Sequence, residues 1–374
     1  MPAYVLIVPD KFKGSLTAQQ AAGSIARGWR KARPDDSLDV LPMSDGGDGF
    51  GQILSALLGA RTRKTATLDA AHRPLHATWW WQATKRTAIV ESAKVIGVAM
   101  LPPKKFHPFQ LDTFGLGKLL AAAAKAGARE CIVGIGGSAT NDGGFGLARS
   151  LGWKFLDRSG GELDEWWRLG GLADARKPAA ALSLRTVVAV DVRNPLLGPA
   201  GCSRVYGPQK GLRPQDFAFA EKCLGRLASR MKEQHGIDVA NIPGAGAAGG
   251  LGFGLMAFAD AKVESGFDLF ARFAQLEKRI RTADLVITGE GAIDEQTRMG
   301  KGVGQIARLC ARCGVPCVAL AGIVEKSIRE SRFFSDIRAL TDHATPQRAR
   351  ALAARLLEQL AEEASSDFAG RGRI

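Results

Sequence analysis

A short apolar run that passes directly into a glycine-rich polar loop constrains the fold of this chain more than any other feature. Residues 131–135 are apolar and rich in β-branched side chains, which is typical of a buried parallel strand. Residues 136–144 combine four glycines with hydroxyl, amide and carboxylate side chains. Glycine allows positive φ and close approach of a ligand to the main chain, and backbone N–H groups in such a loop can cradle an anion. Taken alone, the loop is explained equally well as a tight strand-to-helix turn.

The alternation of strands and helices returns near both ends of the chain. We predict strands at residues 3–9 and 38–43, each followed by a glycine-containing polar loop and a helix. Further strands are expected at residues 284–288, 316–320 and 337–340. Such alternation is typical of a parallel sheet with helices on its faces.

The middle of the chain has a different pattern, with a predicted hairpin at residues 76–82 and 87–93. A length of 374 residues also exceeds the usual size of a single core. We therefore expect an α/β protein of two domains. One is a Rossmann/flavodoxin-like parallel sheet built from both chain ends (residues 1–65 plus 283–374), and the other is a mixed α/β domain inserted at residues 66–282.

The composition narrows the classes of partner. The formal net charge is +14, which suits either a nucleic acid or an anionic small molecule. Lys and Arg are dispersed, and neither a zinc-finger spacing nor an aromatic–basic RNA-binding signature is present in the sequence. The pattern favours a small-molecule enzyme over a nucleic-acid-binding protein.

The N-terminal residues, the length of the apolar runs and the cysteines predict a cytoplasmic protein that does not bind a membrane. Met1 is followed almost at once by a predicted strand, and no apolar run reaches transmembrane length. Cys310, Cys313 and Cys317 form the one cysteine cluster, and a second pair that would complete a zinc site is missing from the sequence. We interpret them as ordinary core thiols.

Polar and charged side chains follow many of the predicted strands. Ligands of open α/β sheets bind outside the carboxyl ends of the strands. Structural capping explains one or two acids there, whereas a polyanion with a divalent cation explains the whole set better, because carboxylates hold Mg²⁺ and lysines and loop N–H groups hold phosphates. The set comprises Asp10, Lys13, Asp45, Asp48, Ser138, Asn141, Asp191, Glu290 and Asp294.

Other enzyme classes fit less well. The sequence contains neither the G-x4-G-K-[ST] motif of P-loop enzymes nor a G-x-S-x-G nucleophile elbow. The segment from Gly244 to Gly249 does read G-x-G-x-x-G, with Glu264 further on, but a proline precedes it and we expect no strand that would place Glu264 beside a ribose. A nicotinamide-dependent hydroxy-acid dehydrogenase and a non-catalytic sensor of a small ligand stay open as alternatives.

Seven segments, taken in order, resemble the bacterial glycerate kinase family, the non-P-loop type that phosphorylates D-glycerate. The segments are VPDKFKGSLTA, SDGGDGF, GIGGSATNDGG, DVRNPLLG, YGPQKG, PGAGAAGG and TGEGAIDEQT, and they span the chain almost from end to end. The resemblance implies two α/β domains with the active site in the cleft between them, MgATP as the phosphoryl donor, and 2-phosphoglycerate as the favoured product. A homodimer is one of the oligomeric states left open.

We assign roles to the matching positions as hypotheses. Asp191 is expected to orient or deprotonate the glycerate hydroxyl because it ends a central strand abruptly, with Asp45 as the second candidate. Glu290 and Asp294 are the candidate Mg²⁺ ligands. Ala292 stands where many relatives are expected to carry an arginine. Substrate or phosphate contacts are expected from Lys13, Ser15, Gly46, Gly47, Asp48, Gly136, Gly137, Ser138, Asn141, Asp142, Arg193 and Asn194.

Overall fold

The computed structural model describes residues 1–298, 300 and 302–368. The chain divides into two compact units, Met1–Ser44 with Phe270–Ile374 and Asp45–Leu269. These limits differ from the expected ones at 65/66 and 282/283. The reason is packing: α2 (Phe50–Leu58) packs on β4 and β5 of the second unit, whereas α11 (Leu276–Thr282) packs on β1 and α13 of the first.

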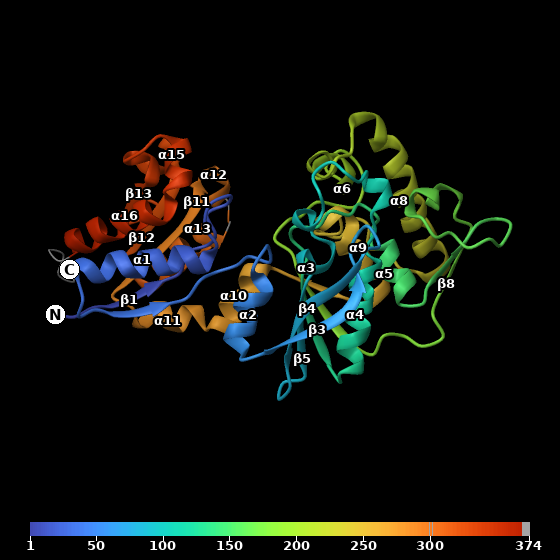
Figure 1. Ribbon diagram of the computed structural model, residues 1–374, viewed down its shortest axis with the longest axis horizontal. Helices are drawn as coiled ribbons and strands as arrows, with labels where there is room; N and C mark the ends of the chain where they lie inside the picture. Colours follow the sequence, from blue (N-terminus) through green and yellow to red (C-terminus); the bar gives the residue numbers. More distant parts are fainter. Residues whose placement is uncertain (299, 301, 369–374) are drawn as a thin grey trace. The chain divides into compact units, whose positions relative to one another are not determined.

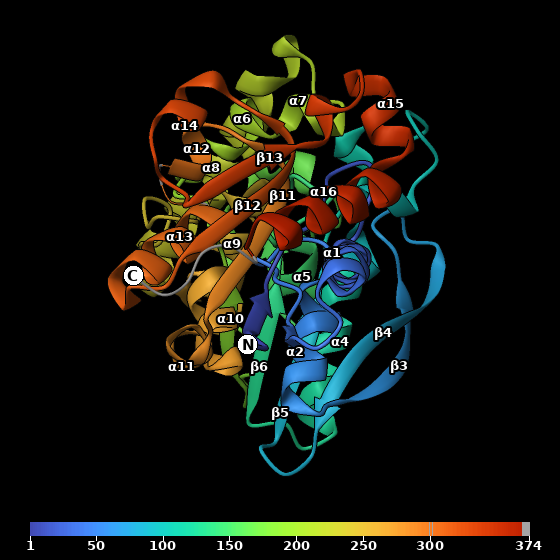
Figure 2. The same ribbon diagram turned by 90° about the vertical axis from the view of Figure 1, so that its left-hand side faces the viewer.

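The first unit contains a five-stranded parallel sheet, as predicted, in the order β13-β12-β11-β1-β2. Both chain ends contribute to it, because β1 pairs with β2 on one side and with β11 on the other, and Val5 lies opposite Leu285. Figure 2 shows β12 between β11 and β13. The strands are β1 (Tyr4–Ile7), β2 (Ser37–Val40), β11 (Leu285–Ile293), β12 (Cys317–Val324) and β13 (Asp336–Ala339).

Two long helices of the first unit, α1 (Ala18–Ala32) and α16 (Ala353–Phe368), lie side by side (Figure 1). A Cβ atom at Gly28 would lie 2.0 Å from the Glu358 carbonyl oxygen, so this close contact requires glycine. Thr17 and Gln20 form a capping box that begins α1. A shorter helix, α15 (Pro346–Ala351), precedes α16. The other helices are α12 (Glu295–Arg298), α13 (Gly302–Cys313) and α14 (Lys326–Glu330).

The second unit contains a six-stranded mixed sheet in the order β10-β9-β6-β5-β4-β3. The first four strands are parallel, and β4 pairs antiparallel with both β5 and β3, which confirms the predicted hairpin. The two edge strands, β3 and β10, were not predicted. The strands are β3 (Arg61–Leu68), β4 (Pro74–Gln82), β5 (Thr87–Glu91), β6 (Glu130–Gly134), β9 (Arg185–Ala189) and β10 (Lys262–Glu264).

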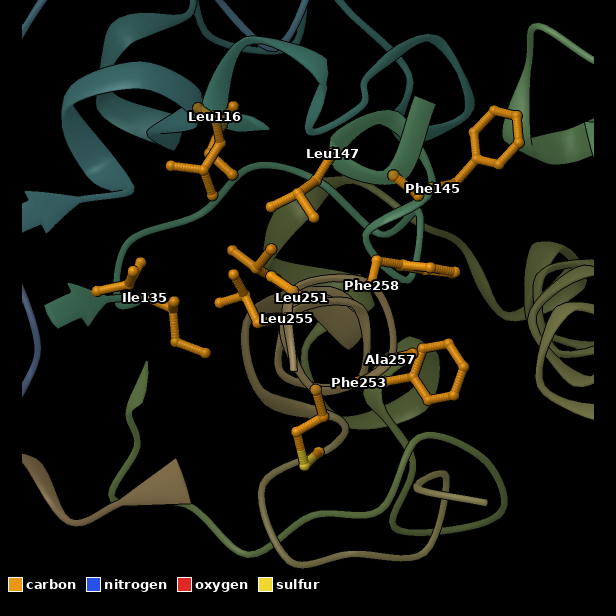
Figure 3. Close-up of a cluster of buried hydrophobic side chains, with 14 of the residues drawn as sticks. Leu116, Ile135, Phe145, Leu147, Leu251, Phe253, Leu255, Ala257 and Phe258 are labelled. Carbon is orange, nitrogen blue, oxygen red and sulfur yellow. The ribbon is translucent and has the colours of Figure 1, made fainter. Parts of the chain in front are cut away.

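The core of the second unit forms around α9 (Ala247–Ala259), which is buried along most of its length. Figure 3 shows its leucines and phenylalanines meeting side chains of α4 (Phe114–Lys125) and α5 (Phe145–Ser150). The residues that meet there include Leu116, Ile135, Phe145, Leu147, Leu251, Phe253, Leu255 and Phe258. Other elements of this unit are α3 (Ala93–Ile96), α6 (Cys202–Val205), α7 (Gly207–Lys210), α8 (Pro214–His235), β7 (Lys154–Leu156) and β8 (Asp174–Arg176), and the limit between the units falls within α10 (Gly266–Ala274).

Among the described residues, no helix is both long and apolar enough to cross a membrane. All six cysteines are free thiols. The Nε2 atom of His72 lies 2.9 Å from a carboxylate oxygen of Asp112.

Candidate functional site

In the second unit, the acidic glycine loop that follows Ser44 lies across the carboxyl ends of β6 and β9. The N–H of Gly136 donates to the carbonyl of Gly46 at 3.3 Å, and a Cβ atom at Gly46 would lie 3.2 Å from the Ala189 carbonyl oxygen. Gly46 also has a φ of 98°, which disfavours other residues. The loop therefore lies where parallel α/β sheets bind their ligands.

The two glycine loops approach each other so closely that side chains would not fit between them. A Cβ atom at Gly136 would lie 2.6 Å from the Cα of Gly47, and one at Gly137 would lie 2.4 Å from a carboxylate oxygen of Asp48. Gly137 has positive φ as well. The structure thus brings together the predicted residues Gly46, Gly47, Asp48, Gly136 and Gly137, and close contacts favour glycine at positions 46, 136 and 137.

Asp191 lies just beyond the end of β9, next to the same acidic loop. Its Oδ1 accepts hydrogen bonds from the Ser265 hydroxyl at 2.8 Å and from the N–H of Gly266 at 3.1 Å. A Cβ atom at Gly266 would lie 2.1 Å from the Asp45 carbonyl oxygen and 2.6 Å from Asp191 Oδ2. The Asp45 main chain and the Asp191 carboxylate therefore meet at one glycine.

The environment of Asp191 suits a carboxylate that can accept a proton. Loss of hydration raises the pKa of Asp191 to about 6, and the negative charge of Asp45 contributes in the same direction. The hydrogen bond from Ser265 opposes that shift. The side chain nevertheless keeps contact with solvent, so a small molecule can reach it.

Asp142 is placed differently from Asp191, because protein donors occupy both of its oxygens. Its carboxylate accepts from the N–H and hydroxyl of Thr113 and from the N–H groups of Gly144 and Gly146, at 2.7–3.2 Å. Burial raises the pKa of Asp142 to about 6, with the Asp112 charge adding to it. These contacts join the loop to the start of α4, which is a structural role.

Other polar side chains of the glycine-rich loop at residues 136–144 are also buried. The hydroxyl oxygen of Ser138 lies 3.0 Å from that of Thr140 and accepts the N–H of Thr140. The amide nitrogen of Asn141 donates to Ser203 at 2.9 Å. Ser138 and Asn141 follow the glycine pair along the same loop.

Arg193 and Asn194 follow Asp191 but have different environments. Arg193 is exposed, and no ion pair of its guanidinium occurs within residues 1–298, 300 and 302–368. Asn194 accepts the Tyr206 hydroxyl at 2.6 Å and donates to the carbonyl of Ala200 at 2.8 Å. The Asn194 side chain thus holds the loop between β9 and α6, whereas the Arg193 side chain is available to an anion.

Glu91 lies at the carboxyl end of β5, and sequence reasoning missed it. It is 1% exposed, and its two oxygens accept the N–H groups of Gly49 and Gly51 at 3.0 and 3.1 Å. The carboxylate therefore caps α2, whose N-cap residue is glycine and has no side chain to do so. Its signal in the sequence is an acid at the end of the apolar run 87–91.

The remaining predicted residues belong to the first unit, where the loop after β1 lies against β11. A Cβ atom at Gly291 would lie 3.0 Å from the backbone nitrogen of Lys13. Lys13 is exposed, and the hydroxyl of Ser15 donates to the carbonyl of Phe12 at 3.1 Å. The carboxyl ends of β1 and β11 thus present the Lys13 ammonium side chain to solvent.

Glu290 and Asp294 meet at Thr297 in the first unit. Glu290 Oε1 accepts the Thr297 hydroxyl at 2.8 Å, and Asp294 Oδ1 accepts the N–H groups of Gln296 and Thr297, which caps α12. Ala292 is exposed between them. Within the described part of the chain, no group of three or more His, Cys, Asp or Glu side chains is arranged to hold a metal.

The G-x-G-x-x-G segment does not have the surroundings of a dinucleotide fingerprint. Residues 236–246, all of which are described, contain no strand leading into it. Glu264 lies in the edge strand β10, where its carbonyl accepts the N–H of Val190. The glycines of the segment serve packing instead, since a Cβ atom at Gly246 would lie 2.1 Å from the Pro195 carbonyl oxygen.

The model of the glycerate kinase family matches residues 5–369. The chain belongs to the glycerate kinase family. This glycerate kinase family member is 40% identical to the glycerate kinase of Halalkalibacterium halodurans over 328 residues, covering 85% of each chain. It is 36% identical to the glycerate 2-kinase of Escherichia coli K12 over 322 residues, covering 85% of this chain and 84% of that one.

A solved structure extends the similarity to the fold. The crystal structure described as "putative glycerate kinase 2" from Salmonella typhimurium LT2 superposes with a TM-score of 0.83, at 31% identity, and covers 99% of both chains. The sequence-based assignment of the family and of its α/β fold is thereby confirmed. The roles of the individual residues stay predictions.

Proposed function

We propose that this protein transfers the γ-phosphoryl group of ATP to D-glycerate, with 2-phosphoglycerate as the favoured product. Membership of the glycerate kinase family and similarity to a glycerate 2-kinase support the reaction and the product. The observation that supports the proposal most directly is the position of Asp191. Its carboxylate is accessible to solvent, has a raised pKa and lies next to the two closely packed glycine loops.

The chemistry follows from positioning and charge. The glycerate hydroxyl oxygen attacks the γ-phosphorus, the bond to the β–γ bridging oxygen breaks, and ADP leaves. Asp191 accepts the hydrogen bond of the attacking hydroxyl and takes its proton as the new P–O bond forms. Its pKa near 6 leaves it largely ionised at neutral pH and still able to accept that proton.

The glycine loops and the exposed cations have separate tasks in this proposal. The backbone N–H groups of Gly46, Gly47 and Gly137 would hold phosphate or carboxylate oxygens, whereas the Gly136 N–H already donates to the Gly46 carbonyl. The exposed cations Lys13 and Arg193 would neutralise phosphate or carboxylate charge.

Glu290 and Asp294 fit a magnesium ion by their chemistry. Mg²⁺ prefers oxygen ligands and is usually held by one or two carboxylates together with substrate phosphates and water, so a larger protein cluster is not required. Both carboxylates flank Thr297. When bound there, the ion would neutralise charge on the ATP phosphates.

The test is phosphorus NMR of the purified protein with MgATP and D-glycerate. A new phosphomonoester signal supports the kinase, and its coupling to protons identifies the acceptor hydroxyl. Binding of glycerate without product would instead favour a sensor, and absence of both would reject the proposal.

We also propose the cytoplasm as the compartment, because six free thiols suit a reducing environment. The homodimer stays a prediction that sedimentation of the purified protein tests.

A further inference from the structure

Lys210, at the end of α7, places an ammonium group against the loop that follows β6. Its Nζ donates to the carbonyl of Thr140 at 2.7 Å. Within residues 1–298, 300 and 302–368, no carboxylate forms an ion pair with it. An ammonium group has three donors, so a single carbonyl leaves this one with unused hydrogen-bonding capacity.

The side chain next to that carbonyl, Asn141, is unsatisfied. Asn141 is fully buried, its amide nitrogen donates to Ser203, and its Oδ1 has no hydrogen-bond partner in the described part of the chain. A buried amide oxygen without a donor costs free energy unless water or a ligand fills the position. The same holds if the amide is rotated, because the nitrogen would then lack a partner.

Gly249 lies against both Lys210 and the backbone of Thr140 and Asn141. A Cβ atom at Gly249 would lie 2.7 Å from Lys210 Nζ, 2.0 Å from the Thr140 carbonyl oxygen and 2.9 Å from the Asn141 Cα. Ala248, Gly249 and Gly250 all have positive φ, so the backbone turns away from this point in an unusual conformation. Glycine adopts positive φ readily, so Ala248 is the residue of the three for which this conformation is uncommon.

We propose that Lys210 and Asn141 form the recognition site for a small hydroxy acid, with the Lys210 ammonium binding its carboxylate and the Asn141 amide binding its hydroxyl. A hydroxyl group both donates and accepts, so it satisfies Asn141 in either orientation. This inference rests on the proposed function, since glycerate is a hydroxy acid, and it identifies the residues that select the acceptor rather than ATP.

The local electrostatics agree with a ligand carboxylate at this position. Loss of hydration lowers the pKa of Lys210 to about 8, while the Cys202 thiol and the Asp142 carboxylate act against that shift. Cys202, Asp142 and Lys210 are the ionisable groups of this cluster. A bound carboxylate would add a direct partner that Asp142 does not provide, because donors of the protein occupy the Asp142 oxygens.

The experiment is calorimetric titration of D-glycerate without ATP into the wild type, Lys210→Met, Lys210→Arg and Asn141→Ala. Glycerol, which lacks the carboxylate, and propionate, which lacks the hydroxyl, serve as comparison ligands. Lys222→Met is the matched control, because Lys222 is an exposed lysine of α8. Circular dichroism and ATP affinity report whether each variant is folded.

We expect Lys210→Met to weaken glycerate binding by about tenfold or more and to remove the preference for glycerate over glycerol. Lys210→Arg should keep part of that preference, and Asn141→Ala should weaken glycerate but not propionate. Lys222→Met and all ATP affinities should be unchanged.

Wild-type glycerate affinity in a folded Lys210→Met protein would overturn the proposal. If Lys210→Met does not fold, an unchanged affinity of Asn141→Ala for glycerate overturns the proposal instead. A water molecule would then satisfy the Asn141 amide. A wild type that binds hydroxy acids through Lys210 yet transfers no phosphate would contradict the kinase function and leave this site standing.

Discussion

The hydroxyl of Ser265 donates to Oδ1 of Asp191 at 2.8 Å, which links the first residue after β10 to the second residue after β9. This hydrogen bond orients the carboxylate through Oδ1 and does not involve Oδ2. Because β10 is a short edge strand, its pairing with β9 directly determines where the Asp191 carboxylate points.

Replacing Asp191 by asparagine should abolish most of the activity. The amide keeps the shape of the side chain but loses the charge and the ability to take a proton, so we expect kcat to fall by about a hundredfold or more. Steady-state kinetics with circular dichroism measures it, with the exposed Asp35→Asn as the control. Turnover near that of the wild type would reject the assignment of Asp191.

The pH dependence of the reaction should report the same carboxylate. Because the pKa of Asp191 is raised to about 6, kcat/KM should rise as the pH increases through about 6 and then level off. The Ser265 bond lowers that pKa, so Ser265→Ala should move the midpoint to higher pH. A midpoint that Ser265→Ala leaves in place would assign the titration to another group.

Glu91→Gln should destabilise the second unit. The glutamine oxygen can accept one of the two N–H groups of Gly49 and Gly51, but its own NH₂ then opposes the other in a buried site. We expect a loss of about 1–3 kcal/mol in the free energy of unfolding. Urea denaturation measures it against Glu165→Gln, an exposed position that should change little.

His72 should contribute a pH-dependent term to stability. Its hydrogen bond to Asp112 raises the pKa of His72 in the folded protein. The contribution is therefore fully present below about pH 6.5, the unfolded value, and is lost as the pH rises through the folded pKa. The Tm difference between the wild type and His72→Asn should shrink from pH 5.5 to pH 8.5, and a constant difference would contradict it.

Gly249→Ala should be strongly destabilising. The new methyl group would lie 2.0 Å from the Thr140 carbonyl oxygen, at a backbone φ of 76°. We expect a loss of about 2 kcal/mol or more in the free energy of unfolding. Gly171→Ala is the control, because no atom lies within 4 Å of its Cβ position and its φ is not positive.

Much of the fold could be predicted because the signals are local. The strands β1, β6, β9, β11 and β12 are apolar runs buried in sheets, and a glycine or a polar loop follows each of them. The edge strands β3 and β10 escaped prediction since polar residues dominate them, and only their neighbours make them strands. The limits of the two compact units differ from the expected ones because the packing partners of α2 and α11 are evident only in three dimensions.

The sequence by itself determined which residues could take part in chemistry and where the chain would bend. Glycines, acidic residues and the ends of strands can be recognised from residue types and short-range patterns. Tertiary structure alone decided which acids are engaged elsewhere. In the folded protein, Asp142 accepts hydrogen bonds from four protein donors, whereas the Asp191 side chain stays accessible to solvent. Glu91 lies at the start of α2, where it accepts two backbone N–H groups. The physical reason is that burial and hydrogen-bond partners depend on residues far apart in the chain, and they decide whether a carboxylate supports the fold or meets a ligand.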